Sequence, residues 1–166
     1  MLEGQPGVYA AGQRTAGFTE TINASGKFEV VASVPANWSR EEAFNAATTI
    51  LQQYPDLIGF YANNDGMALG VVEAVKAAGK QEQVAVFGTD GISDAYAAVR
   101  AGDLTGTVDS FPVLTGEIAM EVALRLMAGQ DLPRVVATPQ ALITKDNVET
   151  YATGDMAALR AALTAE

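Results

Sequence analysis

The sequence predicts an open, doubly wound α/β domain in which a parallel sheet carries helices on both faces. The first observation is that short apolar runs rich in Val, Ile and Phe alternate with longer segments of helical length. The second is that Gly, Pro, Asn or Asp bounds each apolar run, as is typical of strand ends. Strict alternation of strand and helix yields parallel strands, because right-handed crossovers place helices on the faces of the sheet.

The predicted elements follow one another along the whole chain. The strand runs are 28–34, 57–61, 84–88 and 105–108, and the helical segments are 9–25, 39–53, 67–78, 93–101 and 112–128. The tail is expected to add a short strand at 141–144 and a final helix at 156–163. Met1 and Leu2 have the character of the end of a strand, and a secretory signal would lie outside this sequence.

Two helix starts can be recognised from local chemistry. Asp65 precedes the apolar helical segment that Met67 opens, so it is expected to cap that helix. Pro112 suits the first position of the helix over 112–128, where a missing N–H costs nothing. Each of these starts follows closely on the carboxyl end of a predicted strand.

The composition excludes several kinds of protein. The 166 residues suit one compact domain, and the absence of Cys and His excludes disulfides, thiolate metal sites and a Ser-His-Asp triad. A net charge of −10, from 20 acidic and 10 basic residues, makes nucleic acid an unfavourable partner. No apolar run reaches the ~18 residues that span a bilayer. No metal or organic cofactor is expected, because neither a calcium-type carboxylate loop nor a phosphate-binding glycine motif is present.

Polar side chains follow the carboxyl ends of the predicted strands, which is where open α/β sheets bind ligands. The candidate site residues are Arg14, Trp38, Asn64, Asp90, Asp109 and Ser110. Carboxylates accept hydrogen bonds from hydroxyl groups, guanidinium groups donate to them, and amides do both. With one indole ring to cover an apolar face, this set suits a neutral polyhydroxy ligand.

A purely structural alternative exists for Arg14, for Trp38, and for the two aspartates Asp65 and Asp90. Asp65 suits a helix cap better than a ligand contact, and Asp90 could serve only the turn that it forms with Gly91. Trp38 could cover the edge of the sheet, and Arg14 could be a solvated charge on a helix. Spacing alone leaves these alternatives open.

Two motifs have the order and spacing of a known family. Residues 60–70 read FYANNDGMALG and residues 86–92 read VFGTDGI. Together they resemble the ribose-type periplasmic sugar-binding proteins, the substrate-binding subunits of ABC sugar importers, and the resemblance extends from about Gly4 to Val148. It implies the C-terminal lobe of a clamshell protein that closes on a sugar without catalysing a reaction. It also implies an N-terminal lobe and an ABC permease as partners, in the periplasm or another extracytoplasmic space.

The resemblance assigns a role to four of the candidates. Arg14 matches an arginine that donates to sugar oxygens, and Trp38 matches an aromatic residue that stacks on the sugar. Asn64 matches an asparagine that bonds hydroxyl groups, and Asp90 matches an aspartate that accepts from two of them. These four residues would form most of this lobe's half of the site.

One wall of the implied site departs from the ribose pattern. Ser110 stands where ribose binders carry a glutamine, so this wall should bind differently, and Asp109 could take part. The Gly-Thr-Asp-Gly-Ile form at 88–92 is more similar to allose-type binders. The expected ligand is a monosaccharide or sugar alcohol, and a pentose, a hexose and a polyol all remain open.

The resemblance also divides the chain into three parts. Residues 1–111 would form the sugar-binding lobe, 112–140 a helix and crossover that pack on the absent N-terminal lobe, and 141–166 a return strand and C-terminal helix. The helix over 112–128 has an apolar arc wider than the ~100° stripe of a helix lying on one core. Without a second packing partner, this chain is therefore expected to self-associate.

The main alternative is the effector domain of a LacI-type sugar-responsive repressor, which uses the same lobe. Such domains usually carry a Pro-Asp pair before the fourth strand and a GFDD-like motif after it, whereas residues 81–84 read QEQV and residues 88–91 read GTDG. The ending ALITKDN at 141–147 is also more similar to the binding proteins. An enzyme is disfavoured because Asp65 and Asp90 have no nucleophile, metal or histidine partner in the sequence.

Overall fold

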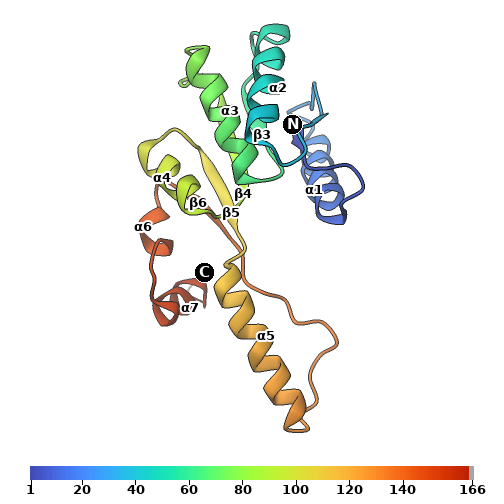
Figure 1. The fold of residues 1–166 in the computed structure, drawn as a ribbon, viewed down its shortest axis with the longest axis vertical. Coiled ribbons are helices and arrows are strands. Elements are labelled where there is room, and N and C mark those ends of the chain that lie inside the picture. Colours follow the sequence, from blue (N-terminus) through green and yellow to red (C-terminus); the bar gives the residue numbers. More distant parts are fainter. Residues whose placement is uncertain (165–166) are drawn as a thin grey trace.

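The structure, a computed structural model, describes residues 1–164 and confirms the α/β alternation (Figure 1). The strands are β1 (Leu2–Glu3), β2 (Val34–Pro35), β3 (Gly59–Tyr61), β4 (Ala85–Asp90), β5 (Gly106–Asp109) and β6 (Ala141–Thr144). The helices are α1 (Tyr9–Ser25), α2 (Arg40–Gln53), α3 (Asp65–Ala77), α4 (Ser93–Ala101), α5 (Pro112–Met127), α6 (Val148–Tyr151) and α7 (Met156–Thr164). Within residues 1–164, no helix combines the length and the apolar character needed to cross a membrane.

The strands of the described residues form two sheets that meet beside β3. β3, β4, β5 and β6 are neighbours in that order, and β1 pairs with β2. The pairs β1–β2, β3–β4 and β4–β5 are parallel, as predicted. Leu2 bridges in parallel to Ala62, directly after β3, and so links the two sheets. The carboxyl ends of β1, β3, β4 and β5 therefore share one edge.

β6 differs from the other strands because it runs antiparallel to its neighbour β5. Asp109 lies opposite Ala141, and Gly106 lies opposite Thr144. The chain leaves β5 at Asp109, passes through α5 and residues 128–140, and returns beside the same end of β5. A strand that re-enters at the end where its neighbour left must run back along it.

The predicted strand over 28–34 is wrong for most of its length. Only Val34 and Pro35 form a strand, because their partner β1 is two residues long. A strand needs backbone partners as well as apolar side chains, and residues 28–33 have no strand assignment. Phe28 is instead exposed, beside an apolar cavity of about 280 Å³ that also contacts α1 and β3.

α3 begins two residues earlier than predicted, and a different residue caps it. The Oδ1 of Asn64 accepts a hydrogen bond from the Met67 N–H at 2.9 Å. Asn64 is therefore the cap, and the prediction that Asp65 caps the helix is wrong. Asn64 has an extended backbone, as N-cap residues do, so Asp65 is the first helical residue. Asp65 is buried in the protein.

Close packing of α2 against α3 depends on a glycine. A Cβ atom at Gly70 of α3 would collide with the backbone carbonyl oxygen of Arg40, the first residue of α2. The buried side of α3 contributes Met67 and Val71 to the core, where they lie with Val86 of β4. This core holds the start of α3, and thus the end of β3, in a fixed position.

The remaining boundaries agree closely with the predictions. The helices over 9–25 and 93–101 and the strand over 141–144 are confirmed. Pro112 occupies the first turn of α5, as predicted. The predicted final helix over 156–163 corresponds to α7, while residues 165–166 of the expected last part lie outside the described residues.

α5 and the segment over 128–140 project from the body of the molecule (Figure 1). Met120 and Met127 of α5 are 61% and 85% exposed. On another side of the helix, Arg160 of α7 pairs with Glu117 at 3.2 Å. The apolar surface that the sequence predicts for this helix is therefore present and open to contact.

Candidate functional site

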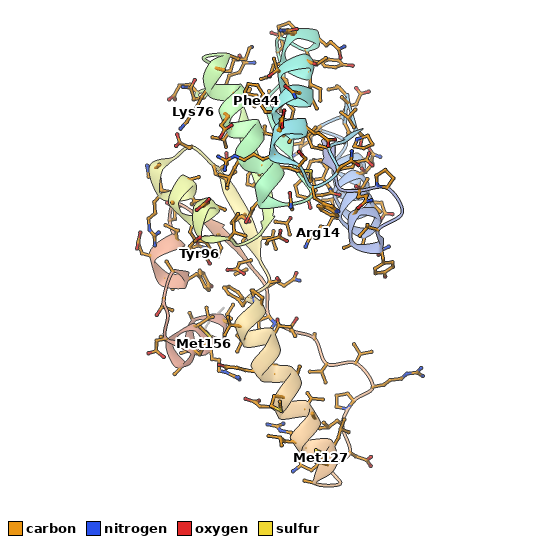
Figure 2. All side chains as sticks on the ribbon, in the orientation of Figure 1. Arg14, Phe44, Lys76, Tyr96, Met127 and Met156 are labelled. Carbon is orange, nitrogen blue, oxygen red and sulfur yellow. The ribbon has the colours of Figure 1, made fainter. Side chains whose placement is uncertain are left out.

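An arginine from α1 lies against the edge where the parallel strands end (Figure 2). The Nη2 of Arg14 donates to Oδ1 of Asp90, the last residue of β4, at 3.0 Å. Its Nη1 donates to the backbone carbonyl oxygen of Asn63, just after β3, at 2.7 Å. Arg14 thus connects α1 to the ends of two neighbouring strands.

The Arg14–Asp90 pair is partly open to solvent, with side-chain exposures of 29% and 36%. Burial raises the pKa of the Asp90 carboxyl above its ordinary value, and the adjacent Arg14 guanidinium counteracts that rise. A carboxylate has about four acceptor positions, so the half-exposed Asp90 keeps the capacity to accept from a ligand. The pair provides donors and acceptors within one small area.

The turn after β4 holds Asp90 in an uncommon backbone conformation. Its φ of 129° lies in a region that non-glycine residues rarely adopt. Gly91 follows with φ 80°, and a Cβ there would collide with the carboxylate of Asp109. Asp90 and Gly91 therefore form a tight turn with little space around it. Asp90 is also a candidate ligand contact.

The buried side chain of Asp65 holds this turn through hydrogen bonds. It is fully buried, and its Oδ2 accepts from the N–H groups of Gly91 at 2.7 Å and Ile92 at 3.0 Å. Its Oδ1 accepts from the Thr107 hydroxyl of β5 at 2.6 Å. Burial raises the pKa of Asp65, and these three hydrogen bonds oppose the rise.

Asn63 has a comparable position on the other side of Asn64. Its Oδ1 accepts from the Gly4 N–H at 3.2 Å and from the Thr15 hydroxyl at 3.1 Å. Asn63 is fully buried, and its Nδ2 has no hydrogen-bond partner among the described residues. It ties the loop after β1 and the helix that carries Arg14 to the end of β3.

Asn64 and Trp38 both lie on this edge, and each has a structural contact. The Oδ1 of Asn64 caps α3, which leaves its Nδ2 as the group that can donate. Trp38 has a φ of 65°, and its half-buried indole lies so close to Gly4 that a Cβ there would collide with the ring. The indole on the loop after β2 therefore packs against the loop after β1.

Asp109 and Ser110 follow β5, and the first of them is bound within the chain. Its Oδ2 accepts from the Tyr96 hydroxyl at 2.9 Å (Tyr96 in Figure 2), and its Oδ1 accepts from the Phe111 N–H at 2.6 Å. Burial, together with Asp109, raises the pKa of the Tyr96 hydroxyl. Ser110 is half-buried, and its carbonyl oxygen accepts from the Thr115 hydroxyl at 3.0 Å.

The sequence pattern did not reveal two contributors to this site. One is the buried Asn63, and the other is Asp65, which is buried and bonds to the turn after β4 instead of capping the helix. Both lie within the Asn-Asn-Asp run that the sequence analysis placed after a strand. The signal was the run itself, since three consecutive polar residues at a strand end require partners when that edge is covered. Nothing in the spacing shows which of the three is exposed.

These features belong to an α/β lobe with guanidinium, amide, carboxylate and indole groups at the carboxyl edge of a parallel sheet, the edge at which open α/β sheets bind ligands. The chain belongs to the periplasmic binding protein domain family, whose profile matches residues 1–131. It is 39% identical over 122 residues to the D-allose-binding periplasmic protein of Escherichia coli, covering 74% of this chain and 39% of that protein. It is 37% identical over 148 residues to the D-ribose/D-allose-binding protein of Pseudomonas aeruginosa, covering 87% of this chain and 46% of that one.

Solved structures show the same similarity. An ABC transporter periplasmic solute binding protein from Actinobacillus succinogenes with bound D-allose superposes with a TM-score of 0.84 at 37% identity, over 90% of this chain and 53% of that one. A solute binding protein from Bacillus halodurans with bound myo-inositol gives a TM-score of 0.78 at 32% identity, over 90% and 52%. The chain thus spans about half the length of the relatives that it matches.

Proposed function

We propose that this chain is the sugar-binding C-terminal lobe of an ABC-importer substrate-binding protein, with a monosaccharide or sugar alcohol as ligand. The observation that carries the proposal is the partly exposed Arg14–Asp90 contact beside Asn64, at the carboxyl edge of the sheet. The family membership and the sugars and polyol named for the relatives support this class of ligand.

The site would bind a polyol through complementary hydrogen bonds. Asp90 accepts from hydroxyl groups, while Arg14 and the Nδ2 of Asn64 donate to hydroxyl or ring oxygens. Because Arg14 already holds Asp90, the carboxylate is oriented before the ligand arrives and less ordering is needed on binding. Charge-assisted hydrogen bonds of this kind contribute about 1.5–3 kcal/mol each.

Two further residues would shape the ligand's surroundings. The indole of Trp38 would cover an apolar face of the sugar ring, and Ser110 would contribute its hydroxyl. Asp109 would act by holding the loop that carries Ser110, since both of its oxygens already accept from Tyr96 and Phe111. A short serine in this wall leaves room for a larger sugar or for a bridging water.

The other half of the site would come from an N-terminal lobe that closes over the sugar. α5 and residues 128–140 would then pack on that lobe, since several of their apolar side chains, among them Met120, Leu124 and Met127, are exposed here. The closed protein would deliver the sugar to an ABC permease from the periplasm or another extracytoplasmic space, without catalysing a reaction. The relatives named above are binding proteins, and the two solved structures are named as ABC transporter proteins, which gives the LacI-type repressor alternative no support.

An NMR titration of the ¹⁵N-labelled chain tests the proposal. D-allose, D-ribose and myo-inositol are added separately, with sodium acetate as a non-sugar control. We expect saturable shifts confined to the loops around Asn64, Asp90 and Ser110, with an affinity in the millimolar range because half of the contacts are missing. A response to acetate alone, or scattered shifts without saturation, would contradict the proposal. Micromolar affinity would contradict the half-site interpretation.

A further inference from the structure

Asp65 has a position that neither helix capping nor ligand contact explains. It is the first residue of α3, it is 0% exposed, and both of its carboxylate oxygens accept hydrogen bonds from other elements. An ionised carboxylate is costly to bury, and it is retained only where several donors satisfy it. Asn64 already caps the helix, so helix capping does not explain why Asp65 is buried.

The contacts of Asp65 join three parts of the molecule. Its Oδ2 holds the N–H groups of Gly91 and Ile92 after β4, and its Oδ1 holds the hydroxyl of Thr107 in β5. The backbone closes tightly around it, because a Cβ at Gly88 would collide with its Oδ1. The carboxylate therefore has little freedom to turn away from these donors.

The residues on either side of these contacts belong to the candidate sugar site. Asn64 directly precedes Asp65, and Asp90 directly precedes Gly91, the residue that Asp65 holds. Asp90 has a φ of 129°, a conformation that persists only where the surroundings enforce it. The amide contacts of Asp65 hold Gly91 and Ile92, the two residues that follow Asp90. Asp90 itself is held by Arg14 and by the pairing of β4 with β5.

We propose that Asp65 is a positioning residue: it holds the strained turn after β4 so that Asp90 faces Arg14 and the ligand, without touching the ligand itself. The ligand's identity rests on the proposed function, but the effect on the turn does not. Removal of the carboxylate should let the turn relax, so that Asp90 loses its fixed relation to Asn64. This role requires hydrogen-bonding atoms at this position rather than a negative charge.

The experiment compares Asp65→Ala with Asp65→Asn. Alanine leaves the Gly91 and Ile92 amides without an acceptor. Asparagine restores one, since its carbonyl oxygen can accept from both amides while its Nδ2 donates to the Thr107 hydroxyl. Amide hydrogen exchange at Gly91 and Ile92, followed by NMR, should accelerate about tenfold or more in Asp65→Ala and stay close to wild type in Asp65→Asn.

The second readout is the site itself. In Asp65→Ala, the Arg14 Nε–H signal should move toward that of a solvated arginine and D-allose affinity should fall about tenfold, while Asp65→Asn retains both. If the wild-type chain shows no sugar response, the proposed function fails, but amide exchange and the Arg14 signal still decide the positioning role.

Thr107→Val keeps the proposal testable where Asp65→Ala does not fold. Valine has nearly the same shape as threonine but cannot donate to Oδ1, so exchange at Gly91 and Ile92 should accelerate while exchange at Val71 in the core does not change. Unchanged exchange at the turn in both Asp65→Ala and Thr107→Val overturns the proposal. Equal damage in Asp65→Asn and Asp65→Ala also overturns it, since hydrogen bonding would then not be the mechanism.

Discussion

The three carboxylates around the candidate site have different tasks although they belong to one residue type. Asp90 is partly exposed and is held by Arg14, whereas Asp65 and Asp109 are buried and accept only from groups of the chain. Burial decides this division, because a buried carboxylate must find its donors inside the protein. A half-exposed carboxylate can accept from a ligand as well.

The buried carboxylates predict how stability depends on pH. Burial, with a smaller contribution from the charge of Asp90, raises the pKa of both Asp65 and Asp109. The folded state then keeps protons that the unfolded state has lost, so these groups favour folding increasingly as pH falls from neutral toward about 4. Asp65→Asn removes one such group, so the free energy of unfolding, measured with urea, should change less between about pH 7 and about pH 4.5.

Asp146→Asn is the matched control for this measurement. Asp146 is exposed, and its substitution makes the same change in charge and shape. Measured in the same way, Asp146→Asn shows how far the loss of an exposed carboxylate alone changes the pH dependence. The same slope for Asp65→Asn and wild type would show that burial does not set the titration of Asp65.

Sequence reasoning placed Arg14, Asn64 and Asp90 at one edge of the sheet because position after a predicted strand is visible in the pattern. The role of Asp65 was not visible. Asparagine and aspartate are equally good caps, so the pattern could not show that Asn64 would cap α3 and leave Asp65 to the interior. Which of the two residues is buried depends on the N–H groups of Gly91 and Ile92, and these residues lie far from Asp65 in the sequence.

The apolar pattern of the sequence predicted whether a segment is a helix or a strand more reliably than it predicted how many residues the segment contains. The alternation of strand and helix is confirmed, because periodicity depends on which face of each element is buried. The strand over 28–34 failed because strand formation depends on a partner, and β1 supplies only two residues. The antiparallel β6 depends on the path of residues 128–140, which no local pattern determines.

The contact between α2 and α3 predicts a matched pair of glycine substitutions. Gly70→Ala introduces a Cβ against the backbone of Arg40, which cannot move without shifting α2. The free energy of unfolding should fall by about 1–3 kcal/mol. Gly17→Ala in α1 meets no atom within 4 Å and should instead stabilise the protein by about 0.5–1 kcal/mol. Chemical denaturation of both variants checks the pair, and an equal effect from both would contradict this interpretation of the contact.

The apolar surface of α5 predicts self-association of this chain. Met120, Leu124 and Met127 are exposed on a helix that projects from the body, and an exposed patch of this kind promotes contact between copies. Light scattering across a dilution series should show a mass above 17.3 kDa that decreases with dilution. The double variant Met120→Glu and Leu124→Glu should shift this transition to higher concentration.

Gln52→Glu provides the comparison for α5, because it adds a negative charge at an exposed position on α2. It should leave the association unchanged. A wild-type chain that stays monomeric at high concentration, with α5 folded back onto its own sheet, would contradict the prediction.

At the scale of the whole molecule, the chain is a lobe with one candidate ligand-binding edge and one projecting arm (Figure 1). The edge combines the ends of β1, β3, β4 and β5, and the arm consists of α5 and residues 128–140. The relatives are about twice as long as this chain. Under the proposed function, a second lobe would supply further ligand contacts and cover the arm at the same time, so one partner would account for both features.

Trp38 is the only tryptophan in the chain, and it lies on the proposed sugar-binding edge, so its fluorescence can report binding without a label. Titration of the chain with D-allose should change the emission of Trp38 saturably, with a dissociation constant in the millimolar range. Asp90→Ala should abolish this response, while Asp146→Asn should retain it. The absence of a saturable change in the wild type, or an undiminished change in Asp90→Ala, would contradict sugar binding at this edge.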